Sequence, residues 1–180
     1  MGKKYRLTDE TVQITRNGKE VTLHRIEALR DFGDVKAGER GGYVESKANL
    51  SHDGNCWVFD NAWICGNAKV YDNAWICGNA KVYGDAKVYG DALVYDNAEV
   101  YGFAEVHGCA KVSNNAEVYG NTDVYGNAKI YGNALVYDNA EVYGNAWVYG
   151  ETEVFGNAWV FGSTKVYGMN KVCGDTELGI

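Results

Sequence analysis

The residues that could do chemistry are few and scattered. The chain has three His and five Cys among its 180 residues, and no two Cys form a C-x-x-C pair. Zinc sites and disulfide frameworks need Cys and His at close, repeated spacings. The sequence also lacks a glycine-rich phosphate loop and a paired-carboxylate motif. We therefore expect no metal and no cofactor, and we expect reduced thiols, which are typical of a cytoplasmic protein.

The charge of the chain argues against two kinds of partner. The formal net charge is −7 and the sequence pI is about 4.9. Nucleic-acid backbones and anionic lipid surfaces repel an acidic protein. No apolar run approaches the length of a membrane span, and the N-terminus lacks a signal-peptide core. The sequence predicts a cytoplasmic protein that binds neither nucleic acid nor membrane.

A repeat of six residues must position these side chains. From Val58 to Leu178 an aliphatic residue recurs at every sixth position, 21 times without an insertion. The typical unit is Ala-x-Val-Tyr-Gly-Asn. Ala and Val lie two apart, so they face the same side of a short strand, and Gly-Asn turns the chain. The pattern predicts an all-β chain of short strands and corners, and it excludes a continuous helix.

The six-residue period resembles the hexapeptide-repeat family, whose left-handed parallel β-helix places three hexads in each triangular 18-residue coil. The resemblance covers residues 42–180. Val44 and Leu50 extend the repeat upstream, and because Leu50 and Val58 are eight residues apart, we expect a two-residue bulge around residues 51–54. Neighbouring coils should pair about 4.8 Å apart.

Residues 1–41 do not follow the repeat and form a second unit. Residues 11–16 and 19–26 alternate like strands, and Asn17-Gly18 between them is a strong hairpin signal. We expect this hairpin to cap the first coil, because an open solenoid end exposes unpaired backbone.

Residues 28–46, with the downstream Asn-Ala-x-Val-Tyr-Gly array, resemble the YdcK-like β-solenoid proteins of bacteria and phages. This resemblance implies no established activity, so no catalytic residue is carried over.

Residues 18 apart should stack in columns on the outside of the coils. One column begins with Trp57, Trp75 and Leu93, an apolar stripe that we interpret as a partner or oligomer face, the alternative being cross-rung packing. Another column contains the acidic ladder of Glu105, Asp123 and Glu141. That ladder could be a binding stripe for a cation, a mimic of phosphates, or a solvated face.

The repeat breaks in one neighbourhood, which is a candidate place for a ligand. Phe103 and Cys109 replace the turn Asn, and His107 and Ser113 replace the Tyr. His107 is the only His in the regular array, and the hexapeptide acyltransferases use a His as general base at sites between the subunits of a trimer. Ordinary drift in a tolerant repeat is the alternative.

The leading interpretation is a non-enzymatic β-solenoid that binds a protein partner or associates with itself. One alternative is an acidic rod that mimics nucleic acid and inhibits a host or defence protein, of a phage or prophage type. The other is a hexapeptide acyltransferase-like enzyme. The last coil lacks a cap, so we expect Val166, Val172 and Leu178 to be exposed. We predict that this coil forms a homo-oligomer, tail to tail around a two-fold axis.

Overall fold

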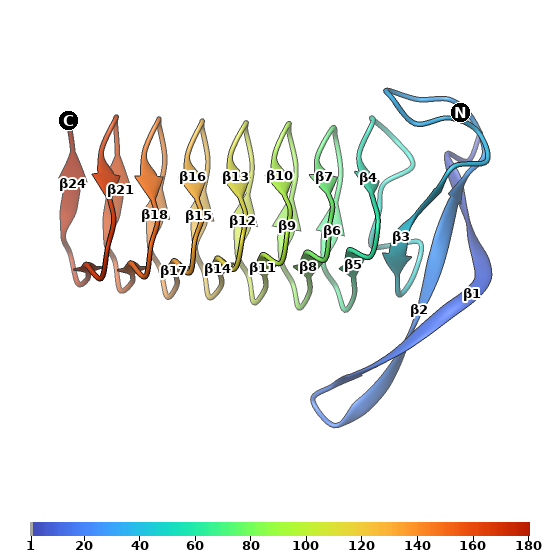
Figure 1. Cartoon of the computed structure of the whole chain (residues 1–180), viewed down its shortest axis with the longest axis horizontal. Helices are drawn as coiled ribbons and strands as arrows, with labels where there is room; N and C mark the ends of the chain where they lie inside the picture. The colour runs from blue at the N-terminus through green and yellow to red at the C-terminus, as the bar shows by residue number, and fades with distance from the viewer. Residues whose placement is uncertain (1) are drawn as a thin grey trace.

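The computed structural model describes residues 2–180, and this range contains 24 strands and no helix. The strands wind into a straight rod, with the N-terminal hairpin at one end and the C-terminus at the other (Figure 1). No segment of the described chain forms the long apolar helix that crossing a bilayer would require. The prediction of an all-β solenoid is confirmed.

Three sheets make up the rod, and each is named here after its first strand. The β1 sheet contains β1 (Tyr5–Arg16), β2 (Lys19–Ala28), β3 (Arg40–Val44), β5 (Trp63–Ile64), β8 (Lys81–Val82), β11 (Glu99–Val100), β14 (Glu117–Val118), β17 (Leu135–Val136), β20 (Glu153–Val154) and β23 (Lys171–Val172). The β4 sheet contains β4 (Trp57–Val58), β7 (Trp75–Ile76), β10 (Leu93–Val94), β13 (Lys111–Val112), β16 (Lys129–Ile130), β19 (Trp147–Val148) and β22 (Lys165–Val166). The β6 sheet contains β6 (Lys69–Val70), β9 (Lys87–Val88), β12 (Glu105–Val106), β15 (Asp123–Val124), β18 (Glu141–Val142), β21 (Trp159–Phe161) and β24 (Glu177–Gly179).

The register between coils is 18 residues, as the resemblance to the hexapeptide-repeat family implies. Val94 pairs in parallel with Ile76 on one side and with Val112 on the other. Each coil therefore gives one strand to each of three sheets, and equivalent side chains stand in straight columns. The left-handed winding stays a prediction.

The interior of the rod consists of the two inward positions of each hexad. The Ala and Val side chains of the repeat, such as Ala92, Val94 and Ala98, are fully buried and belong to one continuous core. A small residue beside a branched aliphatic one fills the narrow triangular section without leaving a void. Burial of these side chains from every coil is the main favourable term in the stability of the rod.

The corners need a left-handed backbone, and Gly or Asp supplies it. Gly102 has a φ of 71°, and a Cβ there would lie 2.9 Å from the backbone nitrogen of Gly120. Asp96 adopts a φ of 59°, and its Oδ2 accepts a hydrogen bond from the backbone N–H of Asn114 one coil later. The inter-coil hydrogen bond of Asp96 thus offsets the free-energy cost of a positive φ at a residue other than Gly.

The predicted N-terminal hairpin is confirmed, and its strands are longer than predicted. β1 and β2 pair antiparallel around Asn17 and Gly18, both of positive φ. β2 pairs antiparallel with β3, and β3 pairs parallel with β5, so the hairpin extends the β1 sheet. Core side chains from this segment, Tyr5 and Phe32 among them, pack at this end against the first regular coil.

The predicted bulge lies where the spacing placed it. Val44 pairs with Ile64 and Leu50 with Val70, both 20 residues apart instead of 18. The buried Lys4 reaches into this bulge, where its Nζ donates hydrogen bonds to the carbonyl oxygens of Asp53 at 3.3 Å and Cys56 at 2.9 Å. A side chain from the N-terminal segment therefore satisfies carbonyl groups that the bulge takes out of the regular ladder.

The prediction that the last coil exposes its inner aliphatic residues is wrong for two of the three. Val166 and Val172 are buried, with Val172 only 5% exposed, while Leu178 is partly buried. The inner Val side chains point into the narrow triangular section, so their own coil and the preceding one cover them. The exposed large apolar side chains of this coil are instead Tyr167, Met169 and Ile180.

Candidate functional site

The aromatic residue that follows most of the short strands forms stacks along the rod. The ring centroids of Tyr83 and Tyr101 are 4.7 Å apart and those of Tyr101 and Tyr119 are 4.8 Å apart, with nearly parallel planes. The Tyr101 hydroxyl donates a hydrogen bond to Glu117, sixteen residues later, at 2.9 Å. The same sixteen-residue contact recurs from Tyr83 to Glu99, from Tyr89 to Glu105 and from Tyr137 to Glu153.

Burial, and then these hydrogen bonds, raise the pKa of the phenols. Burial, followed by the nearby carboxylate, raises the pKa of Tyr101 well above its ordinary value. The same two causes raise the pKa of Tyr137 to about 12. Tyr83, Tyr89, Tyr101 and Tyr137 of the β1 and β6 sheets are therefore neutral, packed structural elements that each donate a hydrogen bond to a carboxylate.

The β4 sheet differs from the other two in the charge of its outward column. This column runs through Trp75, Leu93, Lys111, Lys129, Trp147 and Lys165, which we call the Lys-Trp face. It has no carboxylate in a chain of net charge −7. The sixteen-residue partner of a Tyr here is a Lys or a Trp, so the tyrosine hydroxyls of this sheet lack the carboxylate acceptor found on the others.

Trp57 does not belong to an exposed stripe, so the predicted apolar surface of Trp57, Trp75 and Leu93 is wrong at its first member. Trp57 is 0% exposed, because the rings of Tyr5 and Phe32 pack against it at centroid distances of 6.1 and 5.3 Å. Trp75 and Leu93 pair in adjacent coils and are partly exposed. The role of these two in binding stays a prediction.

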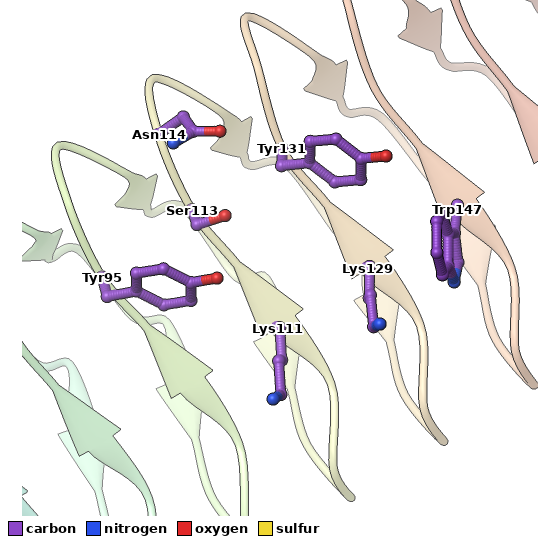
Figure 2. Close-up of a pocket in the computed structure, with 7 residues that line it drawn as sticks. All are labelled: Tyr95, Lys111, Ser113, Asn114, Lys129, Tyr131 and Trp147. Carbon is purple, nitrogen blue, oxygen red and sulfur yellow. The ribbon is translucent and has the colours of Figure 1, made fainter.

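A cavity of about 360 Å³ opens on the β4 sheet where the Tyr column is interrupted. Ser113 takes the place of the Tyr between Tyr95 and Tyr131, and we call the resulting gap the Ser113 slot. Figure 2 shows the Tyr95 and Tyr131 rings projecting in the same direction on either side of Ser113. Lys111 and Lys129 lie along the neighbouring strands at the opening.

The two lysines of the slot stand next to each other without a neutralising carboxylate. Lys111 and Lys129 are cross-strand partners, and within residues 2–180 neither makes an ion pair. Like charges directly opposite each other destabilise a sheet. The Nζ of Lys129 lies 4.5 Å from the centroid of the Trp147 ring, and that of Lys165 lies 4.4 Å from it. The site can therefore attract an anion and stack an aromatic group.

His107, the candidate general base, lies on the β6 sheet and not in the slot. Its ring stacks between Tyr89 and Tyr125 at 4.7 and 5.2 Å, and its Nε2 lies 3.0 Å from an oxygen of Asp123. This is the same sixteen-residue contact that Tyr makes to Glu elsewhere. His107 therefore occupies a tyrosine position in the stack, with its Nε2 engaged by a carboxylate.

The predicted acidic ladder is in register, with Glu105 beside Asp123 and Asp123 beside Glu141. Contacts within the chain shift the pKa values of the first two carboxyl groups in opposite directions. A hydrogen bond from Lys87 lowers the pKa of Glu105, whereas burial raises the pKa of Asp123. Within residues 2–180 no group of three His, Cys, Asp or Glu side chains is arranged to hold a metal ion. The acidic-rod function stays a prediction.

The residues of the repeat break separate onto different faces. Phe103 is 64% exposed and lines a cavity of about 340 Å³ with Lys69, Lys87 and Glu105, whereas Ser113 lines the slot on the β4 sheet. Cys109 is exposed at a corner. The sequence predicted a break of the repeat at Ser113, which interrupts a Tyr column. It did not single out the flanking Tyr95 and Tyr131 or the paired lysines.

The remaining predicted contact is the oligomer interface of Val172 and Leu178. Val172 is buried within its own coil, so only Leu178 of the pair offers accessible surface. Self-association through this coil stays a prediction.

Comparisons with known proteins agree with the solenoid. A family model described as the YdcK β-solenoid repeat matches residues 128–140. The chain is 40% identical over 62 residues to a protein of Escherichia coli strain K12 named "Uncharacterized acetyltransferase YdcK". This match covers 32% of the chain and 19% of the relative. The predicted resemblance is confirmed: the chain is a β-solenoid of six-residue repeats, and its residues 128–140 match the YdcK solenoid repeat.

Proposed function

We propose that this β-solenoid is a non-enzymatic binding module whose Lys-Trp face docks a protein partner with acidic and aromatic groups. The observation that carries the proposal is the unneutralised pair of Lys111 and Lys129 in adjacent rungs of an acidic protein. Such a pair costs stability in the free protein. A carboxylate from a partner would remove this repulsion, so the cost is recovered on binding.

The shape of the rod supports the same function. Its coils are held in register by backbone hydrogen bonds, such as that from the Lys111 N–H to the Ala128 oxygen at 2.9 Å, so the face is rigid before it meets a partner. A preorganised surface loses little conformational entropy on binding. Trp75 and Trp147 add aromatic anchors of the kind that is enriched at protein interfaces.

The test compares two charge-reversal variants with the same change in net charge. Lys111→Glu with Lys165→Glu alters the Lys-Trp face, and Lys19→Glu with Lys69→Glu alters exposed lysines elsewhere. Affinity capture from a lysate should retain a protein on the wild type and on the control variant, and lose it on the face variant. A face variant that retains every protein captured by the wild type would contradict the proposal.

A second candidate function is acetyl transfer, which is favoured by the name of the relative and by the contact between His107 and Asp123. A carboxylate beside the imidazole would orient a general base. Hydrolysis or transfer from acetyl-CoA that depends on His107, measured against a His107→Gln variant, would support this function in place of the binding module.

A further inference from the structure

The Ser113 slot has the dimensions of one missing aromatic ring. In the other two columns, adjacent rings stack 4.7 to 5.2 Å apart, for example Tyr83 on Tyr101 at 4.7 Å and His107 on Tyr125 at 5.2 Å. Tyr95 and Tyr131 are two coils apart, so their rings are separated by roughly 9.6 Å, twice the strand spacing. One planar ring placed midway would meet each of them at the stacking distance of the other columns.

The far edge of such a ring would meet a cation. At four tyrosines of the other columns, Tyr83, Tyr89, Tyr101 and Tyr137, the residue sixteen positions later is a carboxylate that accepts the phenol hydrogen bond, as Glu117 does from Tyr101. Sixteen residues after Ser113 stands Lys129, and sixteen after Tyr95 stands Lys111. A ring seated in the slot would therefore point its outer substituent at an ammonium group instead of a carboxylate, and this position favours an anion.

The rim of the slot is fixed before anything binds. Asn114 adopts a φ of 57°, its Nδ2 donates a hydrogen bond to Asp96 at 2.9 Å, and its Oδ1 accepts one from the Gly132 N–H at 3.2 Å. Trp147 packs edge-on to Tyr131 at a centroid distance of 6.4 Å. These contacts hold the walls in place, so a ligand ring meets a preformed gap.

We propose that the Ser113 slot binds one planar aromatic ring that carries an anionic group on its outer edge, with the ring stacked between Tyr95 and Tyr131 and the anion beside Lys111 and Lys129. The ligand class is an aryl phosphate or aryl carboxylate, either free or as part of a peptide. This proposal rests on the proposed function, because it assigns the centre of the Lys-Trp face its ligand chemistry.

Phenyl phosphate is the probe for titration calorimetry, and cyclohexyl phosphate is the matched anion without a planar ring. The wild type should bind phenyl phosphate at least tenfold more tightly than cyclohexyl phosphate, because only a flat ring fits between two Tyr rings. Ser113→Tyr should weaken phenyl phosphate binding about tenfold or more, since a resident ring then fills the gap. Ser113→Ala should bind within about twofold of the wild type.

Lys129→Met gives a second measurement that does not depend on filling the slot. It should weaken binding of phenyl phosphate about tenfold and leave binding of uncharged phenol unchanged. Equal binding of the cyclohexyl and phenyl phosphates, or unchanged affinity for phenyl phosphate in Ser113→Tyr, would overturn the proposal.

A peptide that carries one phosphotyrosine identifies the source of the ring. Tighter binding of the peptide than of free phenyl phosphate assigns the slot to a protein partner, and the reverse order assigns it to a small molecule; both outcomes support the aromatic anion. The Ser113→Tyr variant in the lysate capture separates the two proposals. If that variant keeps the partner while Lys111→Glu with Lys165→Glu loses it, the face binds and the slot does not.

Discussion

The guanidinium carbon of Arg16 lies 3.4 Å from the centroid of the Tyr83 ring. Tyr83 is the first tyrosine of the stack that continues through Tyr101 and Tyr119. Arg16 ends β1 beside the hairpin turn, so the tip of the hairpin is anchored on the aromatic stack of the shaft. A cation over the face of a ring is attracted by its negative quadrupole.

Arg16→Ala should therefore lower the free energy of unfolding by about 1 kcal/mol. Urea unfolding would measure the loss, and hydrogen exchange of residues 11–22 should become faster while the coils remain protected. Lys19→Ala changes an exposed cation in the same hairpin and should have little effect. Unchanged exchange in the Arg16 variant would mean that backbone pairing alone holds the hairpin in place.

Ser113→Tyr should stabilise the protein, because it restores the ring missing between Tyr95 and Tyr131. The new stacking contacts should add about 1 kcal/mol to the free energy of unfolding. Thermal unfolding would measure this gain against Ser113→Ala, which leaves the gap open. A lower melting temperature for the Tyr variant would show that the slot cannot accept a ring in the stacked orientation.

Tyr101→Phe separates the hydrogen bond of a column tyrosine from its stacking. The variant keeps the ring but loses the donor to Glu117, so we expect a loss of about 1 kcal/mol. Tyr131→Phe is the matched control, because Trp147 stands sixteen residues after it in place of a carboxylate. Equal effects of the two substitutions in chemical denaturation would contradict a role for the carboxylate column.

Acid should destabilise the shaft through carboxylates such as Glu105. The hydrogen bond from Lys87 holds the pKa of Glu105 below its ordinary value of 4.5. A carboxyl group with a lowered pKa in the folded state contributes stability above its unfolded pKa, and this contribution is lost as the pH falls through the folded value. The melting temperature should drop between about pH 5 and about pH 3, and Glu105→Gln should reduce the slope.

Ionisation of Asp123, which lies next to Glu105 in the same column, should have the opposite effect on the pH dependence of stability. Burial raises its pKa above 3.8, so ionisation of Asp123 opposes folding, and that penalty disappears as the pH falls through its folded pKa. As the pH falls, the free energy of unfolding of the wild type should therefore increase relative to that of Asp123→Asn. A parallel pH dependence for Asp123→Asn and Glu105→Gln would contradict this assignment.

Lys4→Met should destabilise the N-terminal end of the rod. The Nζ of Lys4 donates hydrogen bonds to the bulge carbonyl oxygens of Asp53, Gly54 and Cys56. Burial lowers the pKa of Lys4, so keeping its ammonium group charged inside the protein costs free energy. Removal of this donor, however, leaves buried carbonyl groups without a hydrogen bond. We expect a net loss of about 1 to 3 kcal/mol in unfolding experiments. Lys3→Met, at an exposed position, is the control and should be neutral.

Tertiary contacts decided which predicted surface residues are accessible. Trp57 has the same place in the repeat as Trp75, yet Tyr5 and Phe32 cover it, because residues far away in the chain fold back over the first coil. Val172 has the pattern of an end residue, yet the narrow section of the coil buries it. Lys4 looks like a surface lysine of a basic N-terminus and is buried in the bulge.

The sequence alone determined the coil, because a strict period of six specifies inward and outward positions by local geometry alone. The Ala and Val core and the bulge before Val58 follow from that period and its one irregularity. The Asn17-Gly18 turn follows from a local hairpin signal outside the repeat, and the 18-residue register follows from the resemblance to the hexapeptide-repeat family. The slot was decided by the tertiary structure. A missing ring becomes a cavity only when Tyr95 and Tyr131 are held two coils apart by backbone pairing, and the Lys111 and Lys129 charges become a site only because inter-coil register places them side by side at its opening.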